Sequence, residues 1–222
     1  MAAKKVGKKI EGRKIKKKQE NQLKLIAMLM IILVLSIGAF YFIAQELKKF
    51  NYGGVNFQKT KQGDLILYLA NFPLSKLTGN AVNDVNIYFR TDPRQLESIL
   101  IEGRILLKKN VALAVNSDEL KCSDKVVAGT TLSQFLGRFG ISAFGATTDL
   151  NEAQDLNRTY VSCEDASAYD YSVVHFVDGN ASSIKKVGND CYILEVANCE
   201  IMNVTERFMI GAWSGVTRIE LK

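Results

Sequence analysis

The sequence predicts an α/β or α+β single globular domain with a mixed sheet, placed behind one N-terminal transmembrane helix. A run of 20 uncharged residues near the N-terminus predicts the helix. Beyond it, apolar segments typical of β-strands alternate with segments of helical periodicity, which indicates one of the α/β classes. A predicted hairpin and a strand-rich stretch at 160–197 favour a mixed sheet over a fully parallel one.

The transmembrane prediction rests on residues 25–44, which read LIAMLMIILVLSIGAFYFIA. A helix of this length spans about 30 Å, the thickness of the hydrocarbon core of a bilayer. Tyr41 and Phe42 suit the membrane interface, and Lys48 and Lys49 can reach back to it. The run is longer than the apolar part of a signal peptide, and its exit lacks the small residue of a cleavage site. We therefore expect an uncleaved signal anchor over a cleaved signal peptide or a buried soluble helix.

The charge distribution separates a basic tail from a mildly acidic remainder. The chain has 29 Lys and Arg and 23 Asp and Glu residues, a net charge of +6. Residues 1–24 contain 10 of the basic and 2 of the acidic residues, whereas residues 45–222 contain 19 and 21. The basic excess belongs to the tail, so we expect no nucleic-acid partner. By the positive-inside rule the tail stays in the cytoplasm and the C-terminal part lies outside.

Four segments are expected along the chain. They are a basic cytoplasmic tail (1–24), the transmembrane helix (25–44), a stalk (45–54) and one extracytoplasmic α/β domain (55–222). No linker rich in Pro, Gly or Ser interrupts the chain beyond residue 55. A composition with 47% apolar and 23% charged residues is that of a folded domain, not of a disordered chain.

Strands of the outer domain are expected where apolar residues run together or alternate with polar ones. Lys108-Lys109-Asn110, which lies between two such runs, predicts a hairpin turn. The expected strands are 65–70, 85–90, 105–107, 111–115, 160–163, 173–177, 192–197 and 216–221.

Three helices are expected from apolar periodicity and capping signals. A Thr-x-x-Gln capping box predicts a helix that starts at Thr131 and ends at Gly140. An Asp-Pro pair predicts a short helix over 94–100. A helix over 201–213 has apolar residues on most of its surface, so we expect it to be buried.

All four cysteines, Cys122, Cys163, Cys191 and Cys199, lie beyond the anchor, which permits two disulfides in an oxidising compartment. A Cys191–Cys199 bond is disfavoured, since the strand between them separates their Cα atoms by about 26 Å, and a disulfide needs about 4.4–6.8 Å. Two connectivities remain: Cys163–Cys199 with Cys122–Cys191, or Cys122–Cys199 with Cys163–Cys191. We favour the first, because Cys163 and Cys199 each end a strand and would meet if those strands were parallel neighbours. Free buried thiols and reactive thiols are the alternatives.

No sequence signature of a known active site is present, so we assign no catalytic residue, metal or cofactor. His175 is the only histidine, which disfavours a histidine-ligated metal site. It lies in an apolar strand, and we expect a partly buried histidine held by a neighbour, with Glu195 as the candidate partner across adjacent strands. Three sequons for glycosylation start at Asn157, Asn180 and Asn203.

Six charged residues that follow predicted strands form a candidate ligand site. In α/β sheets, ligands bind outside the carboxyl ends of the strands, so such residues can hold a cation or a small polar ligand. The alternative interpretation is helix caps and surface ion pairs. The six residues are Arg90, Asp92, Arg94, Glu164, Asp165 and Glu200.

Three segments resemble uncharacterised single-pass membrane-anchored proteins of archaea: YFRTDPR, ending at Arg94, TYVSCED at 159–165, and CYILEVANCEIMNVTERF at 191–208. The resemblance implies an archaeal type of cell surface and implies no activity. The favoured hypothesis is a membrane-anchored protein whose outer domain binds a partner protein or organises an envelope assembly. The alternatives are an outer domain that binds a small ligand or a cation, and a thiol-redox enzyme.

Overall fold

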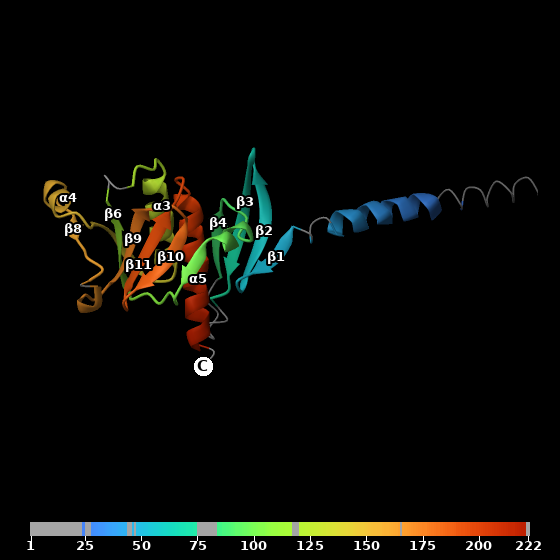
Figure 1. The fold of residues 1–222 in the computed structure, drawn as a ribbon. Helices are drawn as coiled ribbons and strands as arrows, with labels where there is room; N and C mark the ends of the chain where they lie inside the picture. Colours follow the sequence, from blue (N-terminus) through green and yellow to red (C-terminus); the bar gives the residue numbers. More distant parts are fainter. Residues whose placement is uncertain are drawn as a thin grey trace, which may run out of the picture. The chain divides into compact units, whose positions relative to one another are not determined.

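The chain divides into two compact units, Met1–Lys49 and Phe50–Lys222 (Figure 1). The structure, a computed structural model, describes residues 24, 28–43, 46, 48–74, 84–116, 120–164 and 166–220.

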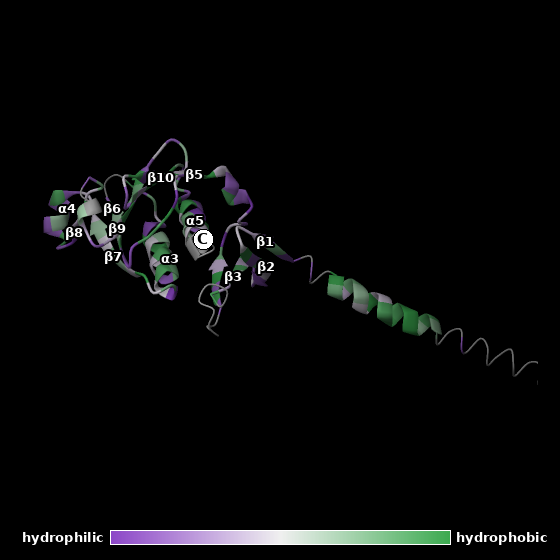
Figure 2. Ribbon diagram, turned by 90° about the horizontal axis from the view of Figure 1, so that it is seen from below, coloured by the Kyte–Doolittle hydropathy of each residue, from purple (hydrophilic) through white to green (hydrophobic). Residues whose placement is uncertain are grey.

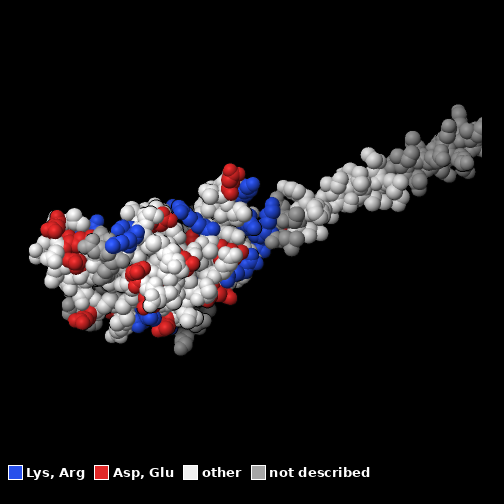
Figure 3. Space-filling view, turned by 45° about the horizontal axis from the view of Figure 1, so that its top comes forward, with Lys and Arg blue, Asp and Glu red and all other residues white. Residues whose placement is uncertain are grey.

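The described part of the first unit is mainly a helix over residues 28–43, whose side chains are all exposed. It is hydrophobic along most of its length (Figure 2), and its surface carries no Lys, Arg, Asp or Glu (Figure 3). Among the described residues, no helix is both long and apolar enough to cross a membrane. Residues 25–27 and 44 of the predicted span, and residues 1–23 of the predicted tail, lie outside the described residues.

A four-stranded sheet has the order β1-β2-β3-β4, in which β2, β3 and β4 pair antiparallel. Its inner face carries buried Phe57, Phe72 and Phe89, while its outer face carries asparagines. β3 and β4 confirm two predicted strands, and β1 lies within the segment predicted as a stalk. The bounds are β1 Lys49–Tyr52, β2 Val55–Gln62, β3 Leu65–Phe72 and β4 Val85–Phe89.

A seven-stranded sheet has the order β5-β10-β11-β9-β6-β7-β8. The neighbours from β11 to β8 run parallel, whereas β10 is antiparallel to β11 and parallel to β5. The predicted mixed α/β class is therefore confirmed. The bounds are β5 Leu100–Glu102, β6 Asn110–Val115, β7 Ser142–Thr147, β8 Thr159–Tyr160, β9 Ser172–Asp178, β10 Ser183–Val187 and β11 Cys191–Val196.

The C-terminal helix α5 lies between the two sheets (Figure 1). Its Phe208 ring lies 5.8 Å from the Tyr192 ring of β11, and its Trp213 ring lies 5.3 Å from the Phe72 ring of β3. One hydrophobic core therefore includes residues of both sheets. The helices are η1 Gln95–Ser98, α3 Lys125–Arg138, α4 Leu150–Asp155, η2 Ala166–Ala168 and α5 Ile201–Glu220.

Several predicted elements are wrong in type or bounds. The short helix predicted over 94–100 is the 3-10 helix η1, which ends before β5 begins at residue 100, and the strand predicted over 160–163 is β8, which ends at residue 160. Residues 105–107 form no strand, and β6 pairs in parallel with β7 and β9, so there is no hairpin. Residues 216–220 continue α5 and do not form a strand. The helix predicted from Thr131 begins instead at Lys125 as α3, so its capping box lies inside the helix. Gly140, with a φ of 73°, ends this helix as predicted.

The two disulfides are Cys122–Cys199 and Cys163–Cys191, with Cα–Cα distances of 5.3 and 5.4 Å. The disfavoured Cys191–Cys199 bond is not formed, but the favoured Cys163–Cys199 pairing is wrong. That pairing requires β8 and β11 to be neighbours, whereas three strands separate them in the sheet. β11 therefore has a disulfide at each end, since Cys191 begins it and Cys199 lies in the turn that follows it.

The three sequons differ in their surroundings. Asn157 and Asn180 are exposed, and Asn157 lies in a turn with a φ of 49°. Asn203 lies in α5, where its side-chain oxygen accepts a hydrogen bond from the Thr91 hydroxyl at 2.7 Å. Glycosylation stays a prediction, and exposure favours Asn157 and Asn180 as acceptors.

Candidate functional site

Three of the predicted ligand residues lie in the turn that follows β4. The Asp92 carboxylate accepts hydrogen bonds from the Arg94 backbone N–H at 3.1 Å and from the Arg94 guanidinium at 2.9 and 2.6 Å. These hydrogen bonds hold the pKa of Asp92 below its ordinary value. The guanidinium also lies over the Phe50 ring, 4.3 Å from its centroid. Asp92 and Arg94 are thus hydrogen-bonded to each other within this turn. Arg90, at the start of the turn, is exposed.

The other predicted ligand residues lie elsewhere. Glu164 follows β8 and is exposed, and Asp165 lies outside the described residues. Glu200 precedes α5 and accepts a hydrogen bond from the Ser182 hydroxyl at 3.1 Å. β4 belongs to the four-stranded sheet, whereas β8 is the edge of the other sheet, and the two lie apart (Figure 1). The structure therefore does not gather the predicted residues into one site.

A buried carboxylate that the sequence pattern does not single out lies against the turn after β4. Glu206 of α5 is 1% exposed. It accepts hydrogen bonds from the backbone N–H groups of Arg90 at 2.6 Å and of Thr91 at 3.1 Å. Burial raises the pKa of Glu206 to about 7, although these hydrogen bonds act in the opposite direction. Glu206 therefore holds the turn against α5 by hydrogen bonds. In the sequence, the feature that could have identified it is an acidic residue within a helix that is otherwise largely apolar.

His175 lies on β9, and its Nε2 is 3.2 Å from the Thr148 hydroxyl oxygen. Glu195 accepts hydrogen bonds from the Ser183 hydroxyl at 2.6 Å and from the Lys185 ammonium at 2.7 Å. The Lys185 hydrogen bond is the main cause of the lowered pKa of Glu195. Glu195 is therefore paired with Lys185, not with His175 as predicted.

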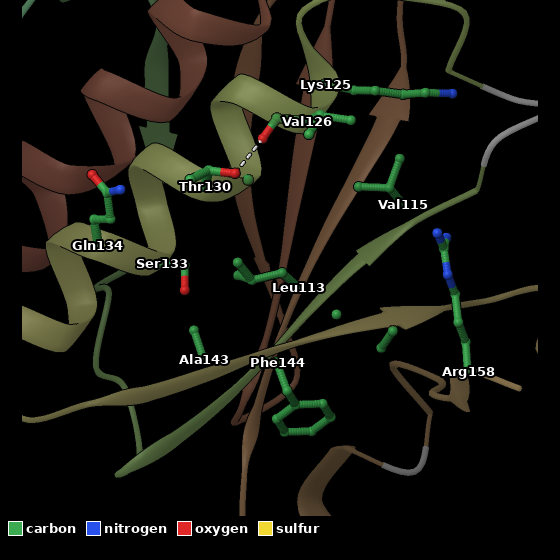
Figure 4. Close-up of a pocket in the computed structure, with 13 residues that line it drawn as sticks. Leu113, Val115, Lys125, Val126, Thr130, Ser133, Gln134, Ala143, Phe144 and Arg158 are labelled. Carbon is green, nitrogen blue, oxygen red and sulfur yellow. Dashed lines mark hydrogen bonds between the residues drawn. The ribbon is translucent and has the colours of Figure 1, made fainter.

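A groove of about 420 Å³ lies between α3 and the strands β6 and β7 (Figure 4). We call it the α3–β7 groove: it is formed by residues 125–134, 113–115 and 143–146 and by Arg158. The Phe144 ring points away from the groove and contacts Tyr171 on the other face of the sheet. The floor of the groove is therefore made of small and aliphatic side chains.

Two glycines face the α3–β7 groove, Gly129 from α3 and Gly145 from β7. A Cβ atom at either position would meet no other atom within 4 Å, and neither residue has a positive φ. Glycine inside a helix or strand costs about 0.5–1 kcal/mol relative to alanine. Among the described residues, nothing in the fold requires either glycine. Both widen the groove, and a strand glycine of this kind marks the close approach of a ligand or another backbone.

One end of the groove carries two cationic side chains. Lys125 and Arg158 lie at the same end as Val115, the last residue of β6 (Figure 4). The Lys125 ammonium donates a hydrogen bond to a backbone carbonyl at 3.2 Å, and Arg158 forms an ion pair with Glu152 at 3.2 Å. The groove is thus apolar along its floor and carries two cationic side chains at one end, of which Arg158 is paired with Glu152.

Large apolar side chains are exposed near this end. Val126, at the start of α3, is 72% exposed. Leu150, the first residue of α4, and Leu156, directly after this helix, are also exposed. Large exposed apolar side chains are a feature of protein-interaction sites when they form a patch.

A second cleft, of about 650 Å³, lies beside α5 and the loop after β5. Close packing explains a glycine that lines this cleft, because a Cβ on Gly211 would lie only 2.7 Å from Ile101 and 2.8 Å from Ile105. Its arginines, Arg104 and Arg207, each donate a hydrogen bond to a backbone carbonyl at 3.1 Å. This cleft therefore follows from the packing of α5, and we assign the candidate site to the α3–β7 groove.

The described residues contain no group of three or more His, Cys, Asp or Glu side chains that could hold a metal ion. All four cysteines are in disulfides. Comparisons with protein-family models, curated proteins and solved structures find no match to this chain. The chemistry that the groove offers is apolar contact together with charge recognition at one end.

Proposed function

We propose that the chain is a membrane-anchored protein whose outer α/β domain binds a partner protein in the α3–β7 groove. The observation that carries the proposal is the pair of glycines, Gly129 and Gly145. Each makes its own helix or strand less stable, and each opens the groove. A segment of a partner chain, with apolar side chains and an acidic residue near Lys125 and Arg158, complements this surface.

Two features support the membrane anchor and the outside location. The helix over residues 28–43 exposes apolar side chains on every side, which suits lipid and not water. The cysteines of the outer domain form two disulfides, which persist in oxidising compartments outside the cytosol.

The alternatives, small-ligand binding and thiol-redox chemistry, have less support. The residues expected to bind a small ligand lie in different sheets, and a small ligand would leave the exposed side chains of Val126, Leu150 and Leu156 uncovered. A thiol-redox enzyme needs an accessible thiol, and every cysteine is bonded.

The test uses the full chain in its native membranes, with a photo-crosslinking amino acid in place of Ser133 in the groove wall. Light should produce one discrete adduct that contains a partner protein. Gly129→Leu fills the groove and should reduce the adduct at least tenfold. Gly137→Leu is the matched control, because Gly137 is also in α3 with open space at its Cβ but does not line the groove. Equal adduct yields in the two variants would contradict the proposal.

The location is tested separately with intact cells. A protease added outside should cleave the outer domain and leave the N-terminal tail protected. Protection of the outer domain until the cells are lysed would place it in the cytoplasm and contradict the anchored orientation.

A further inference from the structure

The outer face of the four-stranded sheet carries one row of asparagines that crosses all four strands. The row is Asn51, Asn56, Asn71 and Asn86, and register places Asn71 beside both Asn56 and Asn86. The opposite face of the sheet packs into the hydrophobic core. These side chains therefore form a surface feature of the sheet and not part of its core.

The amides of this row are held in two pairs. The Asn51 amide N–H donates to the Asn56 oxygen at 2.9 Å, and the Asn71 amide N–H donates to the Asn86 oxygen at 3.0 Å. No side-chain hydrogen bond among the described residues uses the oxygens of Asn51 and Asn71 or the NH₂ groups of Asn56 and Asn86. Each pair thus presents one acceptor and one donor group, in fixed orientation, to a partner outside the sheet.

An aromatic side chain lies in the neighbouring row. Gln58, Leu69 and Tyr88 are opposite one another on β2, β3 and β4, and Tyr88 is 49% exposed. The next pair, Thr60 and Leu67, is also uncharged. These rows contain no Lys, Arg, Asp or Glu on β2, β3 and β4, while the charged residues Lys49 of β1 and Arg90, directly after β4, lie at the margins of the face.

We propose that this outer face binds a neutral carbohydrate chain. A hydroxyl group both donates and accepts hydrogen bonds, which matches the alternating amide oxygens and NH₂ groups of the asparagine row. The exposed face of Tyr88 can stack on the apolar C–H face of a sugar ring. The amides repeat at the strand spacing of about 4.8 Å, comparable to the length of one sugar unit. The uncharged side chains of these rows on β2, β3 and β4 suit an uncharged polymer.

The binding test uses the full chain in detergent and immobilised linear polymers of glucose, mannose, galactose and N-acetylglucosamine. The chain should be retained on at least one of them, and retention should be unchanged at 0.5 M salt, which is far above the roughly 0.15 M at which exposed charges are already strongly screened. An anionic polymer, heparin, serves as the charged probe. Failure to bind any neutral polymer, or salt-sensitive binding to heparin alone, overturns the proposal.

Variants locate the binding on the sheet face. Tyr88→Ala and Asn71→Ala should each weaken retention at least tenfold with an unchanged unfolding midpoint, since both side chains reach solvent. Lys59→Ala is the matched control, because Lys59 lies on β2 between Gln58 and Thr60 and points to the opposite face. Retention that survives both of the first two changes overturns the proposal. A dimer of the chain that Asn71→Lys dissociates would identify a second copy as the occupant and overturn it as well.

This inference is independent of the α3–β7 groove. Gly129→Leu should leave carbohydrate retention unchanged, and Tyr88→Ala should leave the crosslink at position 133 unchanged. The failure of either proposal is therefore distinguishable from the failure of the other.

Discussion

The two sheets of the unit Phe50–Lys222 are stabilised in different ways. The four-stranded sheet contains no disulfide and is held by aromatic packing, in which the Phe57 and Phe89 rings lie 5.5 Å apart and the Phe72 and Trp213 rings 5.3 Å apart. The seven-stranded sheet has a disulfide at each end of β11. Both disulfides therefore lie in the sheet whose parallel strands are joined by long crossover connections, and closing such long loops has the larger entropic cost.

The largest expected effect comes from breaking these covalent links. Cys122→Ala with Cys199→Ala opens a bridge of sequence separation 77, and Cys163→Ala with Cys191→Ala opens one of 28. In the chain-entropy description they lower the free energy of unfolding by about 4.5 and about 3.5 kcal/mol. Denaturant titration of the full chain measures both losses, and hydrogen exchange should show the seven-stranded sheet losing protection first. Equal or greater loss of protection in the four-stranded sheet would contradict the comparison.

The next effect concerns Glu206, which fastens the smaller sheet to α5. Its folded pKa of about 7 is above the ordinary value of 4.5, so the folded state binds the proton more tightly. Its contribution to stability is full below pH 4.5 and is lost as the pH rises through 7, a loss of roughly 3 kcal/mol. Denaturant titrations at pH 5 and pH 8 measure this change in the free energy of unfolding.

Two variants isolate the contribution of Glu206. Glu206→Gln should remove most of the difference between pH 5 and pH 8. Glu200→Gln, which changes an exposed acid just before the same helix, should leave the difference in place. An unchanged pH dependence in Glu206→Gln would show that the carboxylate does not titrate in this range.

The smallest effect compares the two glycines of α3. Gly129→Ala and Gly137→Ala should each stabilise the chain by about 0.5–1 kcal/mol, because alanine is favoured in a helix and each Cβ enters open space. Thermal unfolding measures the gain. Only Gly129→Ala should weaken the partner crosslink. Destabilisation by Gly129→Ala would mean that the fold itself requires this glycine.

The strands that could be predicted from the sequence are those in which neighbouring residues are apolar because most of them are buried. β9 and β11 are largely buried, so 173–177 and 192–197 read as apolar runs interrupted only by His175 and Glu195. The strands that were missed have other compositions: β2 reads VNFQKTKQ, β7 reads SAFGAT and β10 reads SIKKV. Their pairing depends on partners far away in the chain, which local patterns do not contain.

The candidate site was harder to predict for the same reason. The sequence identified Arg90, Glu164 and Glu200 as residues that follow strands, but it could not tell that these strands belong to two sheets. The wrong disulfide pairing has this cause too. The sequence did contain one feature that points to the groove. Gly129 and Gly145 lie inside a helix and a strand, where no turn requires a glycine.

The Cys122–Cys199 bridge has a consequence for a domain exposed to proteases. Any single cut between residues 122 and 199 leaves the two pieces joined, because one half of this bridge lies on each side of the cut. The exposed turn at Asn157 and Arg158 is such a place. The groove residues from Lys125 to Arg158 lie within the bridged segment, so a nicked molecule would remain one covalent particle that keeps both walls of the groove.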